Sequence, residues 1–141
     1  GTADIIDEQP GIEQLDVSVI AFDRYENTGN ARLVMTDGPS YIADLTQELC
    51  GVQNPDGIDL VLYNAGMDPH EEAGGVPGVT TDVIVEREQL VMDWCRHYGI
   101  PVAFVLAGGY SGTARTMGEV ADLHVHTIRA AAQTTQPINA L

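Results

Sequence analysis

Short apolar segments that alternate with helix-length segments constrain the fold of this chain most strongly. Residues 16–23 (DVSVIAFD), 59–64 (DLVLYN) and 102–106 (VAFVL) are rich in β-branched or large apolar side chains, and 32–35 (RLVM) is a shorter candidate. These segments lack the polar alternation of half-exposed strands, which is typical of strands buried on both faces of a parallel sheet. The order of segments predicts an α/β domain with helices on both faces of a mainly parallel sheet.

Three further segments carry the start and stop signals of helices. The first begins near Pro39 and ends before Gly51, and these are the residue types that favour a helix start and a helix stop. The second is capped by Thr80 or Thr81, and the third spans residues 113–132. Each helix follows a candidate strand, as the units of a parallel α/β sheet require.

The chain has 141 residues, enough for a single domain over 1–141 with its own core. Residues 133–141 (QTTQPINAL) are expected to form a flexible tail. Cys50 and Cys95 are far apart and match neither a zinc motif nor a disulfide framework. We therefore expect both to be buried structural residues in a reducing compartment.

Acidic residues dominate the charge, with 21 Asp and Glu against six Arg and no Lys, for a net charge of −15. A surface of this sign repels phosphate backbones, so we expect no direct nucleic-acid binding, and it attracts cationic ligands. No apolar run approaches the ~18 residues of a membrane span, and the N-terminus shows no secretory signal pattern. These observations predict no membrane insertion and a cytoplasmic location.

The loops after the three longer strands are expected to converge, because ligands of open parallel sheets bind beyond the carboxyl ends of the strands. They begin at residues 21–23, 64–68 and 107–111. Asp68 is the candidate metal ligand, since carboxylate oxygens bind zinc. The alternative is that Asp68 caps a turn by accepting backbone N–H groups. His70 either adds a second ligand or is an exposed loop histidine.

The third of these loops contains Gly108, Gly109 and Tyr110. Two glycines let a ligand approach the backbone amides closely, and a tyrosine hydroxyl can donate to an oxyanion as it develops. The alternative is a tight turn with a packed tyrosine. A further alternative is a phosphate or nucleotide site over Gly108–Gly112 at a helix start, although the lysine of a P-loop is absent.

Several motifs occur in the order in which they occur in the histone deacetylase superfamily. They are VLYNAGMD, GG at 74–75, VEREQLV, GIPVAFVLAGGYS and TAR. The pattern resembles acetoin-utilisation proteins and, most closely, class IV deacetylases. The resemblance implies a three-layer α/β/α fold with a mainly parallel sheet, similar to arginase, and a zinc-dependent amidohydrolase that acts on acetyl-lysine or related acylated amines.

The resemblance also implies roles for individual residues. Asp68 matches the second aspartate ligand of the family's zinc ion. Tyr110 matches the tyrosine that polarises the scissile carbonyl, and Gly108 and Gly109 match glycines that line the substrate tunnel.

The family's Asp-x-His zinc ligands and its His-His base pair have no counterpart in this chain. The chain thus resembles the C-terminal half of a deacetylase domain with an incomplete sheet. We expect it to be inactive alone, since hydrolysis needs a firmly held metal and a base. An unpaired sheet edge predicts self-association or pairing with the missing N-terminal half. The alternatives are a non-catalytic α/β interaction module and the phosphate or nucleotide binder.

Overall fold

The computed structural model describes residues 1–7, 9–21 and 24–134. Its elements are α1 (Thr2–Ile6), β1 (Gln14–Ser18), β2 (Ala31–Met35), α2 (Tyr41–Gly51), the 3-10 helix Pro55–Gly57, β3 (Val61–Gly66), α3 (Thr81–His97), β4 (Val102–Ala107) and α4 (Met117–Thr134). The predicted α/β class is confirmed. Helix α1 is an addition that the sequence pattern does not predict.

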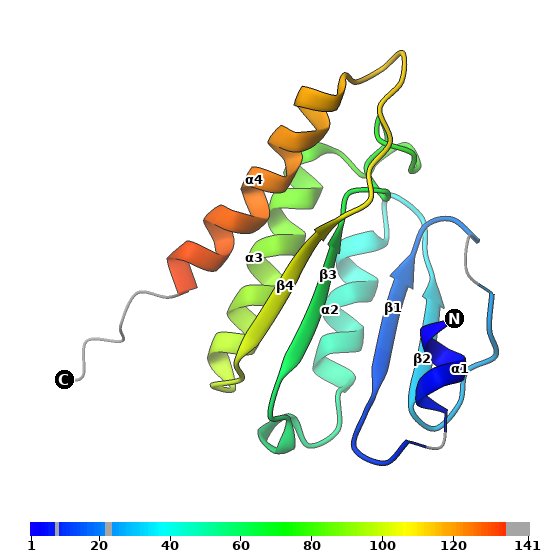
Figure 1. Ribbon diagram of the computed structural model, residues 1–141, viewed down its shortest axis with the longest axis vertical. Coiled ribbons are helices and arrows are strands. Elements are labelled where there is room, and N and C mark those ends of the chain that lie inside the picture. The colour runs from blue at the N-terminus through cyan, green and yellow to red at the C-terminus, as the bar shows by residue number, and fades with distance from the viewer. Residues whose placement is uncertain (8, 22–23, 135–141) are drawn as a thin grey trace.

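The four strands form two parallel pairs, β1 with β2 and β3 with β4. Gln14 lies opposite Ala31 in the first pair, and Val61 lies opposite Val102 in the second. All the strands point the same way, with their carboxyl ends at the top of Figure 1, where β1 and β3 lie side by side. Parallel pairing is therefore as predicted, but it forms two small sheets because β1 and β3 do not pair.

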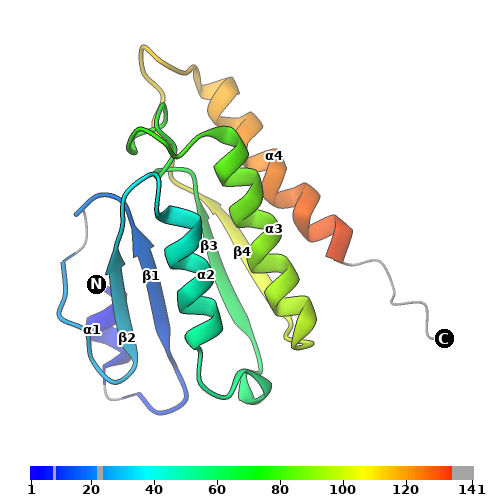
Figure 2. The same ribbon diagram turned by 180° about the vertical axis from the view of Figure 1, so that it is seen from behind.

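The longer helices lie on one face of the strands. α2 and α3 are behind the strands in Figure 1 and in front of them in Figure 2, and α4 lies beside α3 next to β4, while the short α1 lies on the opposite face beside β1 and β2. The prediction that residues 102–106 are buried on both faces is wrong, because Val105 is 60% exposed. The open face explains this exposure, since no described helix covers β3 and β4 there.

The helix signals of the sequence act as expected at α3. The Thr80 side chain accepts a hydrogen bond from the backbone N–H of Val83 (3.4 Å), which caps the first turn. Gly99 follows the helix with a φ of +67°, a conformation that glycine adopts without steric cost. At α2 the predicted boundaries differ slightly: the helix begins at Tyr41, and Gly51 is its last residue rather than the one after it.

Other sequence predictions need correction. Cys95 is buried as predicted, but Cys50 is exposed because it faces away from the core side of α2. The first strand ends at Ser18 rather than at residue 23, and residues 22–23 lie outside the described part of the chain. Helix α4 extends through 134, so residues 133 and 134 belong to the helix rather than to the predicted tail, and residues 135–141 are likewise outside the described part.

The main core lies between the helices and the carboxyl ends of β1 and β3. Its buried members include Tyr41, Met67, Ile84 and Leu123, and Val17 of β1 packs against them. The core therefore joins the two strand pairs through α2, α3 and α4. Across residues 1–7, 9–21 and 24–134, we find no helix whose length and apolar character would let it cross a bilayer.

Candidate functional site

Two loops meet at the carboxyl ends of β3 and β4. The first follows Gly66 and continues to the start of α3, and the second follows Ala107 and continues to the start of α4. The backbone N–H of Tyr110 in the second loop donates to the carbonyl oxygen of Ala73 in the first (2.8 Å). This bond fixes the loops against each other at the rim where the sequence predicts a site.

Asp68 and Gly108 are in direct contact across this rim. A Cβ atom placed on Gly108 would lie 1.6 Å from Oδ2 of Asp68 and 2.5 Å from its Cγ, so only glycine leaves room for the carboxylate in this position. Gly108 also has a φ of +62°, which favours glycine for a second reason. Within the described part of the chain, the half-buried Asp68 carboxylate has no hydrogen-bond or ion-pair partner.

The alternative role of Asp68 as a turn cap therefore has no hydrogen bond to support it among the described residues. The turn is formed by the backbone instead, because the N–H of His70 donates to the carbonyl of Met67 (3.1 Å). The carboxylate is consequently free to bind a ligand that approaches the rim. This geometry is compatible with a metal ligand at Asp68, and that role stays a prediction.

Tyr110 lies next to this carboxylate loop. Its ring is 60% exposed, and a Cβ atom on Gly74 would lie 2.7 Å from the ring carbon Cδ2. The ring thus rests on Gly74 rather than in the core. A cavity of about 330 Å³ opens here between the two loops, lined by Glu71, Glu72, Gly74, Gly75, Tyr110, Ser111, Gly112, Thr113 and Ala114.

His70 is 1% exposed, so the prediction of an exposed loop histidine is wrong. Its Nδ1 accepts from the backbone N–H of Glu72 (3.0 Å), and its Nε2 lies 3.1 Å from Oγ1 of Thr81. The acceptor role of Nδ1 places the proton of the neutral ring on Nε2, which donates to Thr81. Both ring nitrogens are occupied, and His70 therefore serves to hold the loop rather than to bind a metal.

Burial, together with the nearby positive charge of Arg115, lowers the pKa of His70 below its ordinary value. Arg115 reaches Oγ1 of Thr81 (3.3 Å) and forms an ion pair with Glu72 (3.0 Å). Together with the hydrogen bond between Tyr110 and Ala73, these contacts hold the loop after β4 against the loop after β3. His70 is therefore neutral at pH 7 and is part of the support of the rim.

Arg87 of α3 supports the same rim from below, a role that is not among the predictions made from the sequence. Its Nη1 donates to the carbonyl oxygen of Gly66 (2.7 Å), two residues before Asp68. Arg87 is 4% exposed and pairs with Glu88, which is fully buried. Burial opposes the charge of the guanidinium, but Tyr63, Tyr41 and Glu88 offset that effect, and the pKa of Arg87 is raised.

A sequence signal for this pair was present. Arg87 and Glu88 occur three and four residues after the buried Ile84, at the helical spacing of the apolar stripe. Charged residues at such positions are uncommon in a core and point to a paired, hydrogen-bonded role.

His124 of α4 contacts the second loop. Its Nε2 lies 3.3 Å from the carbonyl oxygen of Gly108, which makes the imidazole a donor to the turn that holds Tyr110. Helix α4 itself begins at Met117, five positions after Gly112, so the glycines do not lead directly into the helix N-terminus that a phosphate site requires.

The described residues do not by themselves fit a zinc site. Structural and catalytic zinc ions take at least three protein ligands, and no group of three or more His, Cys, Asp or Glu residues in the described ranges could hold a metal ion. Asp68 could supply one carboxylate ligand. The remaining ligands would have to come from other parts of the protein or from a partner.

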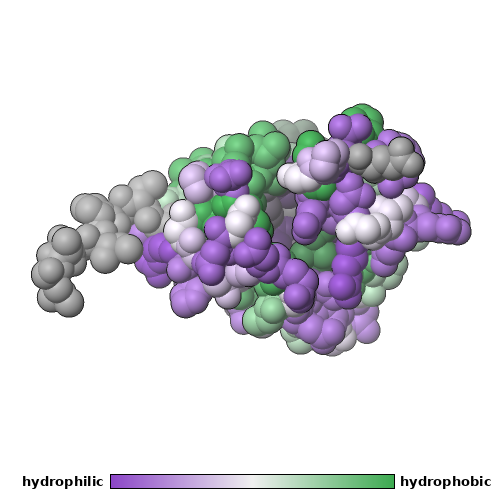
Figure 3. Space-filling model, turned by 90° about the horizontal axis from the view of Figure 1, so that it is seen from below, coloured by the Kyte–Doolittle hydropathy of each residue, from purple (hydrophilic) through white to green (hydrophobic). Residues whose placement is uncertain are grey.

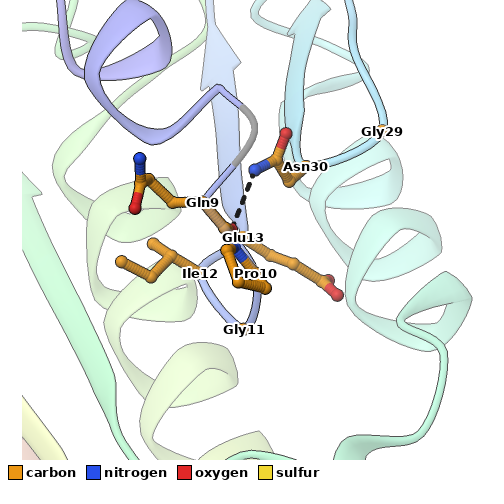
Figure 4. A pocket seen from close by; sticks show the side chains of 7 residues that line it. All are labelled: Gln9, Pro10, Gly11, Ile12, Glu13, Gly29 and Asn30. Carbon is orange, nitrogen blue, oxygen red and sulfur yellow. Dashed lines mark hydrogen bonds between the residues drawn. The ribbon is translucent and has the colours of Figure 1, made fainter.

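A second hollow, of about 320 Å³, lies at the opposite end of the strands. It is lined by Gln9, Pro10, Gly11, Ile12, Glu13, Gly29 and Asn30 (Figure 4). The Asn30 amide donates to the carbonyl oxygen of Gln9 (3.3 Å) and closes one side of it. It is far along the strands from Asp68 and Tyr110 and has one carboxylate, Glu13, so we assign it no chemistry.

The chain matches no protein-family model. It is similar to an uncharacterized protein of Picosynechococcus sp., with 36% identity over 76 residues. The match covers 53% of this chain and 25% of that protein, so the chain corresponds to about a quarter of the length of this curated relative.

Proposed function

We propose that this chain is the C-terminal part of a zinc-dependent amidohydrolase that resembles the histone deacetylase superfamily and removes acetyl or acyl groups from lysine or related amines. The observation that carries the proposal is the Asp68 carboxylate, which lies against Gly108 at the carboxyl end of β3 without a partner among the described residues. A half-buried carboxylate in such a position favours a cationic ligand.

In this proposal Asp68 supplies one ligand of a zinc ion that is completed by residues outside the described part of the chain. The complete protein would have the three-layer α/β/α fold, with a second helical layer on the face that is open here. The length of the Picosynechococcus protein, about four times its matched segment, is compatible with such a larger domain.

Tyr110 would donate a hydrogen bond from its hydroxyl group to the carbonyl oxygen of the scissile amide as negative charge develops there. A preorganised donor of this kind stabilises the transition state more than the ground state. Its exposed ring beside a hollow is compatible with contact to a substrate that arrives from solvent. Gly108 and Gly109 would leave room for the acyl group, since they carry no side chain.

The negative charge of the chain favours a substrate that carries positive groups besides the acylated nitrogen, which as an amide is itself uncharged. A net charge of −15 attracts cationic groups and repels phosphate-rich partners. The cavity beside Tyr110 is lined by Glu71 and Glu72, which add local negative charge. The phosphate or nucleotide alternative lacks both a helix N-terminus at the glycines and a positive lining, and we do not propose it.

The experiment is an assay of the full-length product of the gene that encodes this chain, with a fluorogenic acetyl-lysine peptide and elemental analysis for zinc. We expect turnover and near-stoichiometric zinc. Asp68→Asn should lower both zinc content and turnover, whereas Tyr110→Phe should lower turnover and leave zinc bound. The 141-residue chain alone should show neither zinc nor turnover.

A full-length protein that neither binds zinc nor hydrolyses the peptide would refute the proposal and favour a non-catalytic interaction module. Turnover by the isolated 141-residue chain would refute the proposal that the zinc ion needs ligands from outside the described part of the chain. Ser111→Ala serves as the control variant, because Ser111 lines the same hollow but carries none of the proposed chemistry.

A further inference from the structure

The loop that carries Tyr110 is tied down at its far end by the side chain of Arg115. We propose that Arg115 is a positioning residue: its guanidinium holds this loop against the loop that carries Asp68 and thereby sets the place of the Tyr110 hydroxyl group. The inference rests on the proposed function, because it assigns a role in the same site. Arg115 contacts no reacting atom in this proposal and acts through the placement of Tyr110.

The side chain of Tyr110 does little to fix its own position. Its ring is 60% exposed and rests on Gly74 rather than in the core. Over the described residues, we find no hydrogen bond that holds its hydroxyl group. The position of the ring is therefore set by the backbone of the loop to which it is attached.

The first half of this loop is fixed by hydrogen bonds to its backbone. The N–H of Tyr110 donates to the carbonyl oxygen of Ala73 (2.8 Å), and Nε2 of His124 lies 3.3 Å from the carbonyl oxygen of Gly108. Both contacts act at Tyr110 or before it. The direction in which the chain leaves Tyr110 needs a further restraint.

The second half of the loop has little packing of its own. Residues 111–114 (SGTA) are small and exposed, and a segment with few buried apolar contacts opens easily. The N–H of Gly112 donates to the carbonyl oxygen of Arg115 (2.8 Å), which closes this segment into a turn. The turn therefore follows the position of Arg115, and Tyr110 lies directly before it.

The Arg115 side chain supplies the restraint by reaching across to the opposite loop. Its Nε forms an ion pair with Glu72 (3.0 Å), and its Nη2 donates to Oγ1 of Thr81 (3.3 Å). Arg115 is 19% exposed, so solvent screens this ion pair less than a fully exposed one. A guanidinium presents several donors in a rigid plane and can hold two acceptors at once, whereas a lysine ammonium is a single point of charge.

The proposed reaction depends on this restraint because a hydrogen-bond donor to a developing oxyanion works only when it is in place beforehand. A displacement of about 1 Å in a catalytic group costs up to roughly 100-fold in rate. Loss of Arg115 should therefore lower kcat. KM should change little, since the Tyr110 hydroxyl acts mainly on the transition state.

The first test is turnover of the acetyl-lysine peptide by the full-length product of the gene. Arg115→Met should lower kcat by about tenfold or more and change KM by less than about twofold. Zinc content should stay at the wild-type level, because the contacts of Arg115 do not include Asp68. Arg115→Lys keeps the charge and should regain part of the loss. Thermal unfolding checks that each variant is folded at the assay temperature.

Arg96→Met is the matched control. Arg96 is in the last turn of α3, is 50% exposed and pairs with Asp93 (2.9 Å), so the variant removes an ion-paired arginine away from the rim. The end of the molecule where α3 finishes is the one viewed in Figure 3, and it is hydrophilic over much of its surface. This variant should leave kcat unchanged. Equal losses of kcat in Arg96→Met and Arg115→Met would overturn the proposal.

A double-mutant cycle with Tyr110→Phe separates positioning from general support of the site. Without the hydroxyl group there is nothing left for Arg115 to position, so Arg115→Met should lower the kcat of Tyr110→Phe by less than about twofold. If the two losses multiply instead, Arg115 acts on the site by another route and the positioning role is wrong.

Hydrogen exchange of the full-length protein tests the restraint without reference to activity. The Tyr110 amide donates to Ala73, so its exchange reports how often the loop leaves its place. Arg115→Met should speed this exchange by roughly tenfold, and Arg96→Met should not change it. Unchanged exchange in Arg115→Met would overturn the proposal whatever the activity. If the wild type shows no turnover but Tyr110 exchange responds to Arg115→Met, the proposed function fails and the restraint of the loop by Arg115 is upheld.

Discussion

The contact between Asp68 and Gly108 gives the sharpest prediction from this structure. Gly108→Ala introduces a Cβ atom that would lie 1.6 Å from the Asp68 carboxylate, at a residue with a φ of +62°. The left-handed conformation costs a non-glycine residue about 1–2 kcal/mol. Rotating the carboxylate away from its position costs roughly another 0.5–1.5 kcal/mol. We expect a total loss of about 2–3 kcal/mol in the free energy of unfolding.

Gly99→Ala is the matched control. Gly99 has a similar φ of +67°, but a Cβ atom there meets nothing within 4 Å, so this variant reports the backbone strain alone. The difference between the two variants should be about 1 kcal/mol, or about 4 °C in Tm for a domain of this size. Urea denaturation followed by circular dichroism measures the free energies, and calorimetry measures Tm.

A double-mutant cycle identifies the source of the difference. In an Asp68→Ala background the carboxylate is absent, and Gly108→Ala should then cost no more than Gly99→Ala. If Gly108→Ala and Gly99→Ala cost the same in the wild-type background, the carboxylate does not lie against Gly108 and the geometry of the candidate site is refuted.

Two further predictions concern the groups that support the rim. Because the pKa of His70 is lowered from its ordinary value of 6.5, the unfolded chain binds a proton more readily than the folded chain as the pH falls below that value. The free energy of unfolding should therefore be constant near pH 7 and above with respect to this group, and it should decrease toward pH 5 by at most about 1.4 kcal/mol per pH unit. His70→Gln should remove this part of the pH dependence in urea titrations, and an unchanged pH profile would contradict a buried neutral histidine. Arg87→Met leaves Glu88 buried without its partner and should cost about 3–5 kcal/mol. The double variant Arg87→Met with Glu88→Leu should lose clearly less, and an equal loss would show that the ion pair is not what Arg87 contributes.

Much of the fold could be predicted from local sequence. The strands at 61–66 and 102–107 and the helix at 81–97 lie close to their predicted positions, because apolar runs, the Thr80 cap and Gly99 act over a few residues. The position of Asp68 directly after a strand follows from the same local pattern. The carboxyl ends of the strands share one rim because parallel pairing requires it.

The burial of individual side chains was harder to predict. His70 is in a polar loop sequence, yet it is buried because Thr81 and Arg115, from two other segments, close over it. The helical spacing of Arg87 and Glu88 from Ile84 indicates that they face the core, but their partners Tyr41, Tyr63 and Gly66 come from other segments of the folded chain. Such contacts join residues that are distant in sequence, and no local pattern records them.

The alternation of strands and helices, the helix caps and the positions of the candidate site residues in loops follow from local sequence, because they depend on backbone preferences and short-range periodicity. The contact of the Asp68 carboxylate with Gly108, the placement of α2 and α3 on one face, and the unpaired facing edges of β1 and β3 are evident only in the folded chain. These features depend on how separate segments pack in space. Packing is set by the summed contacts of the whole chain, and no single segment specifies it.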